Sequence, residues 1–141
     1  MSIWQKPISL ETLNASGANT AVSHLGIEFI EFGDDFLRAR VPVDARTIQP
    51  YGLLHGGVSV VLAETLGSSG AYFASPEGHR CVGLDINANH LRSATSGWVT
   101  GTARPIHRGR TTHVWQIDLT NEAGELTCVS RITMAMLLPR Q

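Results

Sequence analysis

The chain of 141 residues has few charges: 16% of its side chains are charged, against roughly a quarter in an average globular protein. Eleven basic and twelve acidic side chains leave a formal net charge of -1. That near-neutrality argues against a whole-protein electrostatic interaction with a nucleic acid or an anionic membrane. A hydrophobic fraction of 43% excludes a disordered chain. A lightly charged surface also favours self-association, because association removes part of that surface from water.

Several other features are missing. No apolar run approaches the ~20 residues that span a bilayer, and no basic segment followed by an apolar one opens the chain as in a signal peptide. We therefore expect a cytoplasmic protein. Without repeats or linker-like stretches, residues 1–141 are expected to form a single domain. Cys81 and Cys128 lack CxxC or Cys/His spacing, which favours buried free thiols, and the six histidines lack metal-ligand spacing.

Lysine is nearly absent, since Lys6 is the only one beside ten arginines. No acidic residue lies between Asp85 and Asp118, and Arg92, Arg104, Arg108 and Arg110 all fall within that window. One interpretation is codon bias in a GC-rich genome. The other is a phosphate site, because guanidinium groups bind phosphate oxygens in pairs.

Hydrophobic periodicity predicts the order of the elements. Ser9 and Thr20 are placed to cap two short helices over residues 10–14 and 21–25. Residues 26–32 and 36–43 are predicted to form a hairpin, and residues 55 to 73 one long buried helix. Further strands are expected over 81–90, 97–105, 112–120 and 126–137. The predicted fold class is α+β, with an antiparallel hairpin and meander wrapped around the helix.

Glu64 is the only charged residue from Leu53 to Ser75. A carboxylate in a buried helix is costly unless it is paired or used, and no Lys or Arg lies three or four residues away to pair with it. These observations favour a functional role. The alternative is that Glu64 lies with Thr65 and Ser68 on a solvent-exposed face of the helix.

His55-Gly56-Gly57 opens the same helix. Unpaired N–H groups at a helix start bind anions or polarise a carbonyl, and glycine permits a close approach; simple helix punctuation is the alternative. Gly56 and Glu64 are eight residues apart, which is about 12 Å along a helix axis. One carbonyl cannot contact both in the same chain. A shared site therefore requires two antiparallel copies of the helix across a two-fold axis.

Two further motifs are weaker. Gly67-Ser68-Ser69-Gly70-Ala71 nearly matches the serine-hydrolase elbow, but its last residue is Ala and it falls within the predicted helix, so we reject it. His107-Arg108-Gly109-Arg110 fits either a tight hairpin turn or a phosphate-binding loop.

The segment Gln49-Pro50-Tyr51-Gly52-Leu53-Leu54-His55-Gly56-Gly57, followed by Ala63-Glu64, resembles the hotdog-fold acyl-CoA thioesterases. The nearest subgroup contains the 4-hydroxybenzoyl-CoA and 1,4-dihydroxy-2-naphthoyl-CoA thioesterases. The likeness covers nearly the whole chain and includes residues 82–90 and the 107–109 turn. In that family a curled antiparallel sheet surrounds one helix, two units pair into a continuous sheet, and dimers commonly pair again into tetramers.

The resemblance implies roles for the matching residues. Glu64 would be the nucleophile or the general base that directs water at the thioester carbon. The Gly56 N–H of the partner subunit would polarise the thioester oxygen. Gln49 and His55 would align the thioester or the water, and Ser68 would orient the carboxylate or contact the acyl group. The residues implied to hold the nucleotide of coenzyme A are His90, Arg92, Ser93, His107, Arg108, Gly109 and Arg110.

The expected reaction is hydrolysis of an acyl-CoA thioester to a free acid and thiol. No metal or organic cofactor is expected, since coenzyme A is part of the substrate. Tyr51, Tyr72 and Phe73 favour an aromatic acyl group, although they would serve equally well as core. The first alternative is a proofreading thioesterase that clears acyl or aryl groups misloaded on a carrier protein. The second is a non-catalytic acyl-CoA-binding domain.

Overall fold

The computed structural model describes residues 1–140, and its elements follow the predicted order. They are α1 (Leu10–Ala15), α2 (Ala21–His24), β1 (Glu28–Phe32), β2 (Leu37–Pro42), α3 (Gly56–Phe73), β3 (Arg80–His90), β4 (Trp98–Arg108), β5 (Thr112–Thr120) and β6 (Leu126–Leu137). Both predicted caps are confirmed. The Ser9 hydroxyl accepts from the Thr12 N–H at 3.0 Å, and the Thr20 hydroxyl accepts from the Val22 N–H at 3.2 Å.

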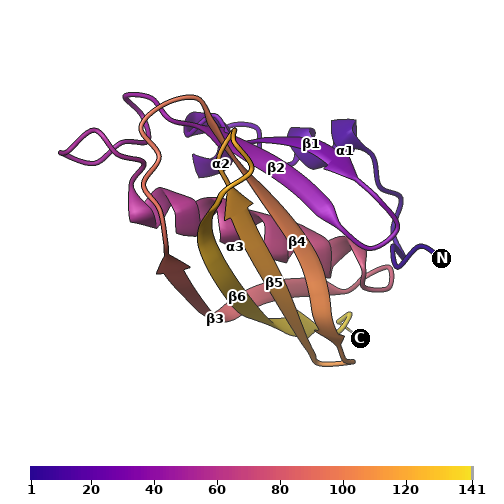
Figure 1. The fold of residues 1–141 in the computed structure, drawn as a ribbon. Coiled ribbons are helices and arrows are strands. Elements are labelled where there is room, and N and C mark those ends of the chain that lie inside the picture. The colour runs from indigo at the N-terminus through magenta and orange to yellow at the C-terminus, as the bar shows by residue number, and fades with distance from the viewer. Residues whose placement is uncertain (141) are drawn as a thin grey trace.

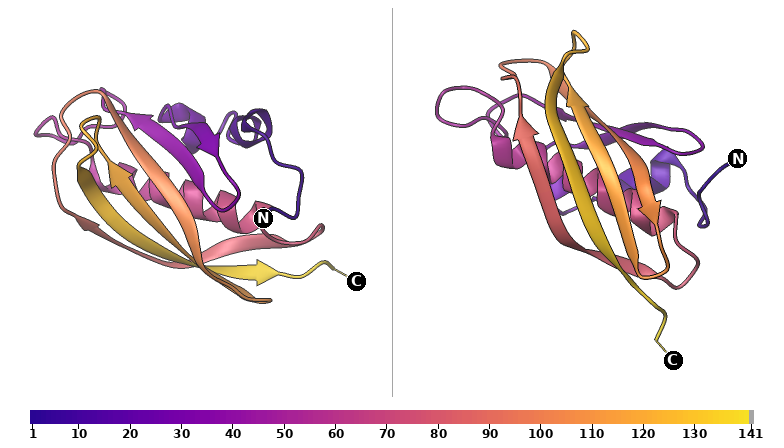
Figure 2. Two further views of the ribbon diagram at one scale, coloured as in Figure 1. Left: turned by 45° about the vertical axis from the view of Figure 1, so that its right-hand side comes forward. Right: turned by 60° about the horizontal axis from the view of Figure 1, so that its bottom comes forward.

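Within the described chain, six strands form one sheet in the order β1-β2-β4-β5-β6-β3, and every neighbouring pair is antiparallel. The sheet curls around α3 (Figure 1). This confirms the α+β prediction of a sheet wrapped around one helix. The expected meander is correct only for β4, β5 and β6. Residues 91–97 carry the chain across the start of α3 (Figure 2). As a result, β3 pairs with β6 at one edge of the sheet, whereas β4 pairs with β2 and β5.

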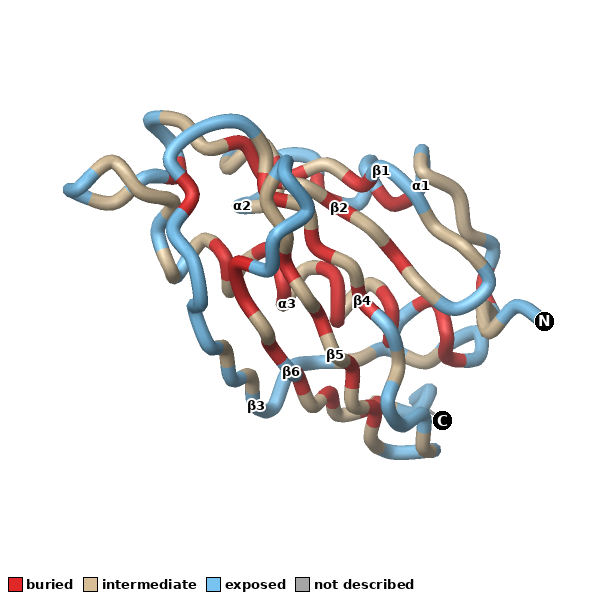
Figure 3. The backbone as a smooth tube through the Cα atoms, viewed as in Figure 1, coloured by how far each residue is buried: buried red, intermediate tan, exposed pale blue. Residues whose placement is uncertain are grey.

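The core lies between α3 and the concave face of the sheet. The helix contributes Leu62 and Leu66, and β5 contributes Trp115, Ile117 and Leu119. Burial alternates along β5 residue by residue, as a strand with one face on the core requires. In Figure 3 the buried positions follow α3 and the central strands, whereas the outer edge at β3 is largely exposed.

Strand β3 departs from the simple alternation of its sequence. A register shift between Gly83 and Asp85 interrupts its pairing with β6, as a β-bulge does when it inserts an extra residue. Ile86 and Ala88 pack against the core, but Val82 and Leu84 are 49% and 64% exposed. The alternating pattern of residues 81–90 therefore predicted the strand correctly but missed this bulge. As a result, β3, one of the two edge strands of the sheet in the described chain, carries exposed apolar side chains.

The N-terminal segment holds the far end of α3. The Gln5 N–H donates to the main-chain oxygen of Phe73 at 2.8 Å. The Lys6 ammonium donates to the main-chain oxygens of Tyr72, Ser75 and His79 at 2.7, 3.2 and 3.1 Å. The bonds to Tyr72 and Phe73 satisfy carbonyl groups that the end of α3 leaves unpaired, and those to Ser75 and His79 hold the segment that follows the helix. Among the described residues, no helix is long and apolar enough to cross a membrane.

Candidate active site

Gln49 lies in the loop between β2 and α3, and its side chain organises that loop. The carboxamide oxygen accepts from the Tyr51 N–H at 2.6 Å and from the Leu53 N–H at 3.3 Å. The Gln49 N–H also donates to the Leu53 oxygen at 2.8 Å. With its oxygen engaged, Gln49 offers its NH₂ group as a hydrogen-bond donor. Tyr51 projects from the same turn and is 87% exposed.

The start of α3 presents one unused donor. His55 is the N-cap, and its Nδ1 accepts from the Gly57 N–H at 2.8 Å. Its main-chain oxygen accepts from the N–H groups of Val58 and Ser59 at 2.9 and 3.1 Å. The Gly56 N–H has no acceptor in the part of the chain that the structure describes. A helix start with a free N–H attracts a negatively charged or polarised oxygen.

Gly56 lies in a cavity of about 370 Å³, which we call the Gly56 cavity. Its walls include Gln49, Ser59 and Thr127, and three predicted nucleotide ligands, His90, Arg92 and Ser93. A Cβ at Gly56 would lie 3.0 Å from His90 Nε2. The absence of a side chain at Gly56 therefore leaves room for the imidazole beside the free N–H.

Glu64 lies two turns further along α3, in a different cavity. This Glu64 cavity has a volume of about 280 Å³ and lies between α3 and the α1–α2 segment, with Leu13, Val22, Thr65 and Ser68 in its walls. The Glu64 carboxylate is half-buried and has no hydrogen-bond or ion-pair partner among residues 1–140. A half-buried carboxylate without a partner remains available to a ligand or to water.

Gly83 is a close neighbour of Glu64 that the sequence analysis did not single out. A Cβ on Gly83 would lie 2.8 Å from Glu64 Oε2, so the bare backbone of β3 makes space for the carboxylate. Glycine within a strand signals the close approach of another group, and that rule would have identified it.

Ser68 lines the Glu64 cavity one turn beyond the carboxylate. Its hydroxyl lies 3.9 Å from Met134 Sδ, and within the described chain it makes no hydrogen bond to Glu64. The Cys81 thiol donates to the Ser68 oxygen at 3.4 Å, and burial raises the pKa of that thiol. Cys81 and Cys128 are both free, as predicted, but only Cys128 is fully buried, whereas Cys81 is partly exposed at the edge strand β3.

A larger cavity of about 620 Å³ continues from the Glu64 cavity toward the end of α3, and we call it the Tyr72 cavity. The two cavities share Ser16, Ser68 and Ser69. Tyr72 and Phe73 line the larger one and meet edge to face, with their ring centroids 5.1 Å apart. A mostly apolar space therefore extends from Glu64 along the helix.

The predicted nucleotide ligands do not come together in one chain. The 107–110 segment lies at the tight turn between β4 and β5, which confirms the hairpin interpretation. Arg108, Gly109 and Arg110 line a cavity of about 280 Å³ near the end of α3, whereas His90, Arg92 and Ser93 line the Gly56 cavity at its start. The arginines of the stretch without acidic residues, between Asp85 and Asp118, thus lie at two ends of the molecule.

His113 lines the cavity beside that turn. It is 3% exposed, and its Nδ1 accepts from the Trp115 indole N–H at 3.2 Å. Burial, reinforced by the charges of Arg108 and His107, lowers the pKa of His113 to about 4. The imidazole is therefore neutral at pH 7.

An antiparallel sheet curled around one long helix is the hotdog fold, here shared with thioesterases of known structure. The chain belongs to the thioesterase superfamily, whose family model matches residues 51–128.

Full-length relatives support the same assignment. A 1,4-dihydroxy-2-naphthoyl-CoA hydrolase of Escherichia coli is 52% identical over 135 residues, covering 96% of this chain and 99% of the relative. The proofreading thioesterase EntH of Cronobacter turicensis is 47% identical, covering 96% and 98%. The crystal structure of a thioesterase from Haemophilus influenzae matches with a TM-score of 0.96 and 53% identity, covering 99% of this chain and 97% of that one. The protein is therefore a thioester hydrolase that acts on a small thioester substrate.

Proposed function

We propose that the protein hydrolyses aromatic acyl-CoA thioesters at a site shared between two subunits. The observation that carries this proposal is the separation of Glu64 from the free Gly56 N–H: they lie in different cavities of one chain, about 12 Å apart along α3. An antiparallel partner helix brings the Gly56 N–H of one subunit to the Glu64 carboxylate of the other.

The sheet edge formed by β3 supports the shared site. Strand β3 pairs only with β6 in the described chain, and its exposed apolar residues Val82 and Leu84 need cover. Gly83, between them, lies against Glu64. Pairing of β3 with β3 of a partner would continue the sheet and bring the partner beside the carboxylate. We propose a dimer of this kind, which pairs again into a tetramer as the resemblance implies.

The roles of the residues follow from their hydrogen bonds. The thioester oxygen accepts from the Gly56 N–H and the Gln49 NH₂ group, both of which are free to donate. The Glu64 carboxylate either attacks the thioester carbon, forming a mixed anhydride that water then hydrolyses to the free acid, or takes a proton from a water that attacks the thioester carbon directly. The carbon–sulfur bond then breaks, and the thiolate of coenzyme A takes up a proton. His55 holds the helix start through its Nδ1, and Ser68 contacts the acyl group.

The acyl group extends from Glu64 into the Tyr72 cavity, where Tyr72 and Phe73 favour an aromatic ring. Coenzyme A lies in the Gly56 cavity against His90, Arg92 and Ser93. His107, Arg108, Gly109 and Arg110 reach its phosphates from another subunit, because they lie at the far end of α3 in one chain. Coenzyme A is part of the substrate, and we propose no metal or organic cofactor for the reaction. The cytoplasmic location stays a prediction from the sequence.

Clearance of a carrier protein is the second candidate, because the relative from Cronobacter turicensis is named a proofreading thioesterase. Both substrates present the same phosphopantetheine arm, so the chemistry at Glu64 is common to them. A panel of benzoyl, hydroxybenzoyl, short-chain and long-chain acyl-CoA thioesters, together with an aryl carrier protein, separates the two. We expect the highest kcat/KM for aromatic acyl-CoA. Higher values for the carrier protein would favour proofreading, and no thiol release from any thioester would contradict the proposed activity.

A further inference from the structure

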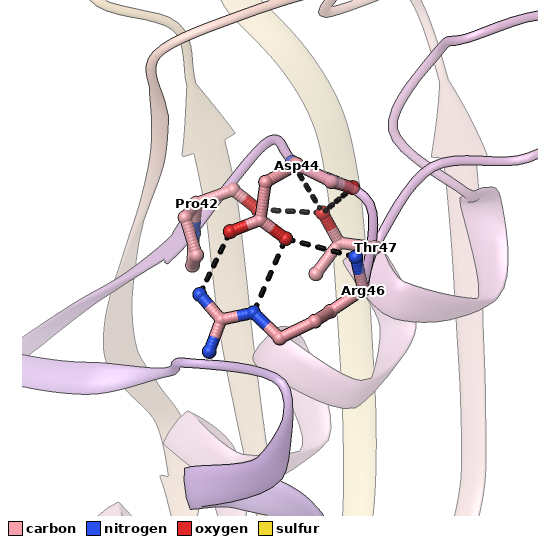
Figure 4. A network of polar contacts seen from close by, with 4 residues as sticks. All are labelled: Pro42, Asp44, Arg46 and Thr47. Carbon is pink, nitrogen blue, oxygen red and sulfur yellow. Dashed lines mark hydrogen bonds and ion pairs between the residues drawn. The ribbon is translucent and has the colours of Figure 1, made fainter.

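Thr47 is a buried polar residue in the loop between β2 and α3. Its side chain is 1% exposed. The hydroxyl donates to the Pro42 oxygen at 2.6 Å and accepts from the Asp44 N–H at 3.0 Å, as Figure 4 shows. Rotation of the side chain would leave these buried groups unpaired, so the hydroxyl is held in one orientation. Because Pro42 ends β2, Thr47 is attached directly to the sheet.

Asp44 closes the turn around Thr47. Its main-chain oxygen accepts from the Thr47 N–H at 2.9 Å. Its carboxylate accepts from the Arg46 N–H at 2.9 Å and from the Arg46 guanidinium at 2.7 Å, and these bonds lower the pKa of Asp44. The turn therefore keeps its hydrogen bonds throughout the neutral pH range, and Thr47 is held from both its side chain and its main chain.

The main-chain oxygen of Thr47 then reaches the start of α3. It accepts from the His55 N–H at 2.8 Å, so the residue before Gly56 is bound to Thr47. The His55 oxygen is bound on the other side by the N–H groups of Val58 and Ser59. The C=O and N–H of a trans peptide point in opposite directions. The bonds to the His55 oxygen therefore direct the Gly56 N–H out of the helix, toward the cavity that Gly56 lines, and the bond from the His55 N–H to Thr47 holds the preceding peptide in place.

We propose that Thr47 is a positioning residue for thioester hydrolysis: its hydroxyl, bound to the end of β2, fixes the direction of the Gly56 N–H. The inference rests on the proposed function, which assigns that N–H to the thioester oxygen. Thr47 touches neither the substrate nor the reacting atoms. It acts through the His55 N–H, which belongs to the peptide just before the one that carries the Gly56 N–H. Its loss therefore lowers the rate of the chemical step and leaves the binding of coenzyme A intact.

Three variants of the full chain test this. Thr47→Val keeps the shape of the side chain but makes no hydrogen bond, and Thr47→Ser keeps the hydroxyl. Ser130→Ala is the matched control, because the Ser130 hydroxyl is equally buried and donates to the Ile117 oxygen at 2.7 Å, away from the loop. Steady-state kinetics on benzoyl-CoA are combined with amide hydrogen exchange over residues 49–58, which needs no activity.

We expect kcat to fall about 10- to 100-fold in Thr47→Val with KM unchanged, as for a misplaced catalytic group. Thr47→Ser should restore most of that loss, and Ser130→Ala should keep the wild-type kcat. Exchange over residues 49–58 should accelerate in Thr47→Val only. A loss confined to KM, a loss equalled by Ser130→Ala, or unchanged exchange over 49–58 overturns the proposal. An inactive wild-type protein would contradict the proposed function instead, and the exchange result would still decide whether Thr47 fixes the loop.

Discussion

Replacing Gly83 with alanine places a methyl group against the Glu64 carboxylate. The new Cβ would lie 2.8 Å from Glu64 Oε2, whereas ordinary contact begins at 3.4 Å, so the oxygen must move by about 0.6 Å. A misplacement of about 1 Å costs on the order of 100-fold in rate, and we therefore expect kcat to fall about tenfold. Stability should not fall, because alanine in place of glycine within a strand gains about 0.5–1 kcal/mol.

The assay is kcat on benzoyl-CoA together with the thermal unfolding midpoint. A second variant, Glu64→Asp, shortens the carboxylate and relieves the contact with the new methyl group. The fold-decrease in kcat of the double variant should therefore be smaller than the product of the fold-decreases in the two single variants, since the effects of residues in contact are not additive. An unchanged kcat in Gly83→Ala would refute the reasoning, as would a loss of activity that only follows a loss of stability.

Two further predictions concern Glu64 and His113. Glu64→Ala should lower kcat by several orders of magnitude and leave the affinity for coenzyme A unchanged in a calorimetric titration; near-normal turnover would move the chemistry elsewhere. The pKa of His113 lies near 4 in the folded chain and near 6.5 when unfolded, so the unfolded chain binds more protons between these values. Its contribution to stability should fall by about 3 kcal/mol as the pH drops from 6.5 to 4. His113→Gln, which keeps an acceptor for Trp115, should lose this dependence in denaturant titrations, and an unaltered dependence would assign it to other groups.

Local signals in the sequence predicted much of the fold. The caps at Ser9 and Thr20, the apolar run of residues 55–73 and the alternation of 112–120 each depend on neighbouring residues, and each is confirmed. The pairing of β3 with β6 depends on where the loop after β3 crosses α3. Contacts between residues that are distant in the sequence decide that path, and periodicity does not report them.

The site divides in the same way. The isolation of Glu64 in an apolar helix and the glycines at the helix start are visible in the sequence, and so is the distance between them. The approach of Gly83 to Glu64 depends on a bulge in β3, and the reach of Thr47 to His55 depends on a folded loop. The sequence marks Gly83 only as a glycine within a strand; that it approaches Glu64, and that Thr47 bonds His55, is visible only with coordinates. The resemblance grouped His90 with Arg108, and the structure places them in different cavities of one chain.

Complementation between two inactive variants tests most directly the claim that two subunits share the site. Glu64→Ala removes the carboxylate. Gly56→Pro removes the free N–H at the first helical position, where the helix backbone tolerates proline, and its ring also displaces the imidazole of His90 in the same subunit. In a mixed dimer, one site carries both changes and the other carries neither. Random exchange should therefore restore roughly one quarter of the wild-type activity, since half of the dimers are mixed. No recovery after native mass spectrometry has demonstrated exchange would contradict the shared site.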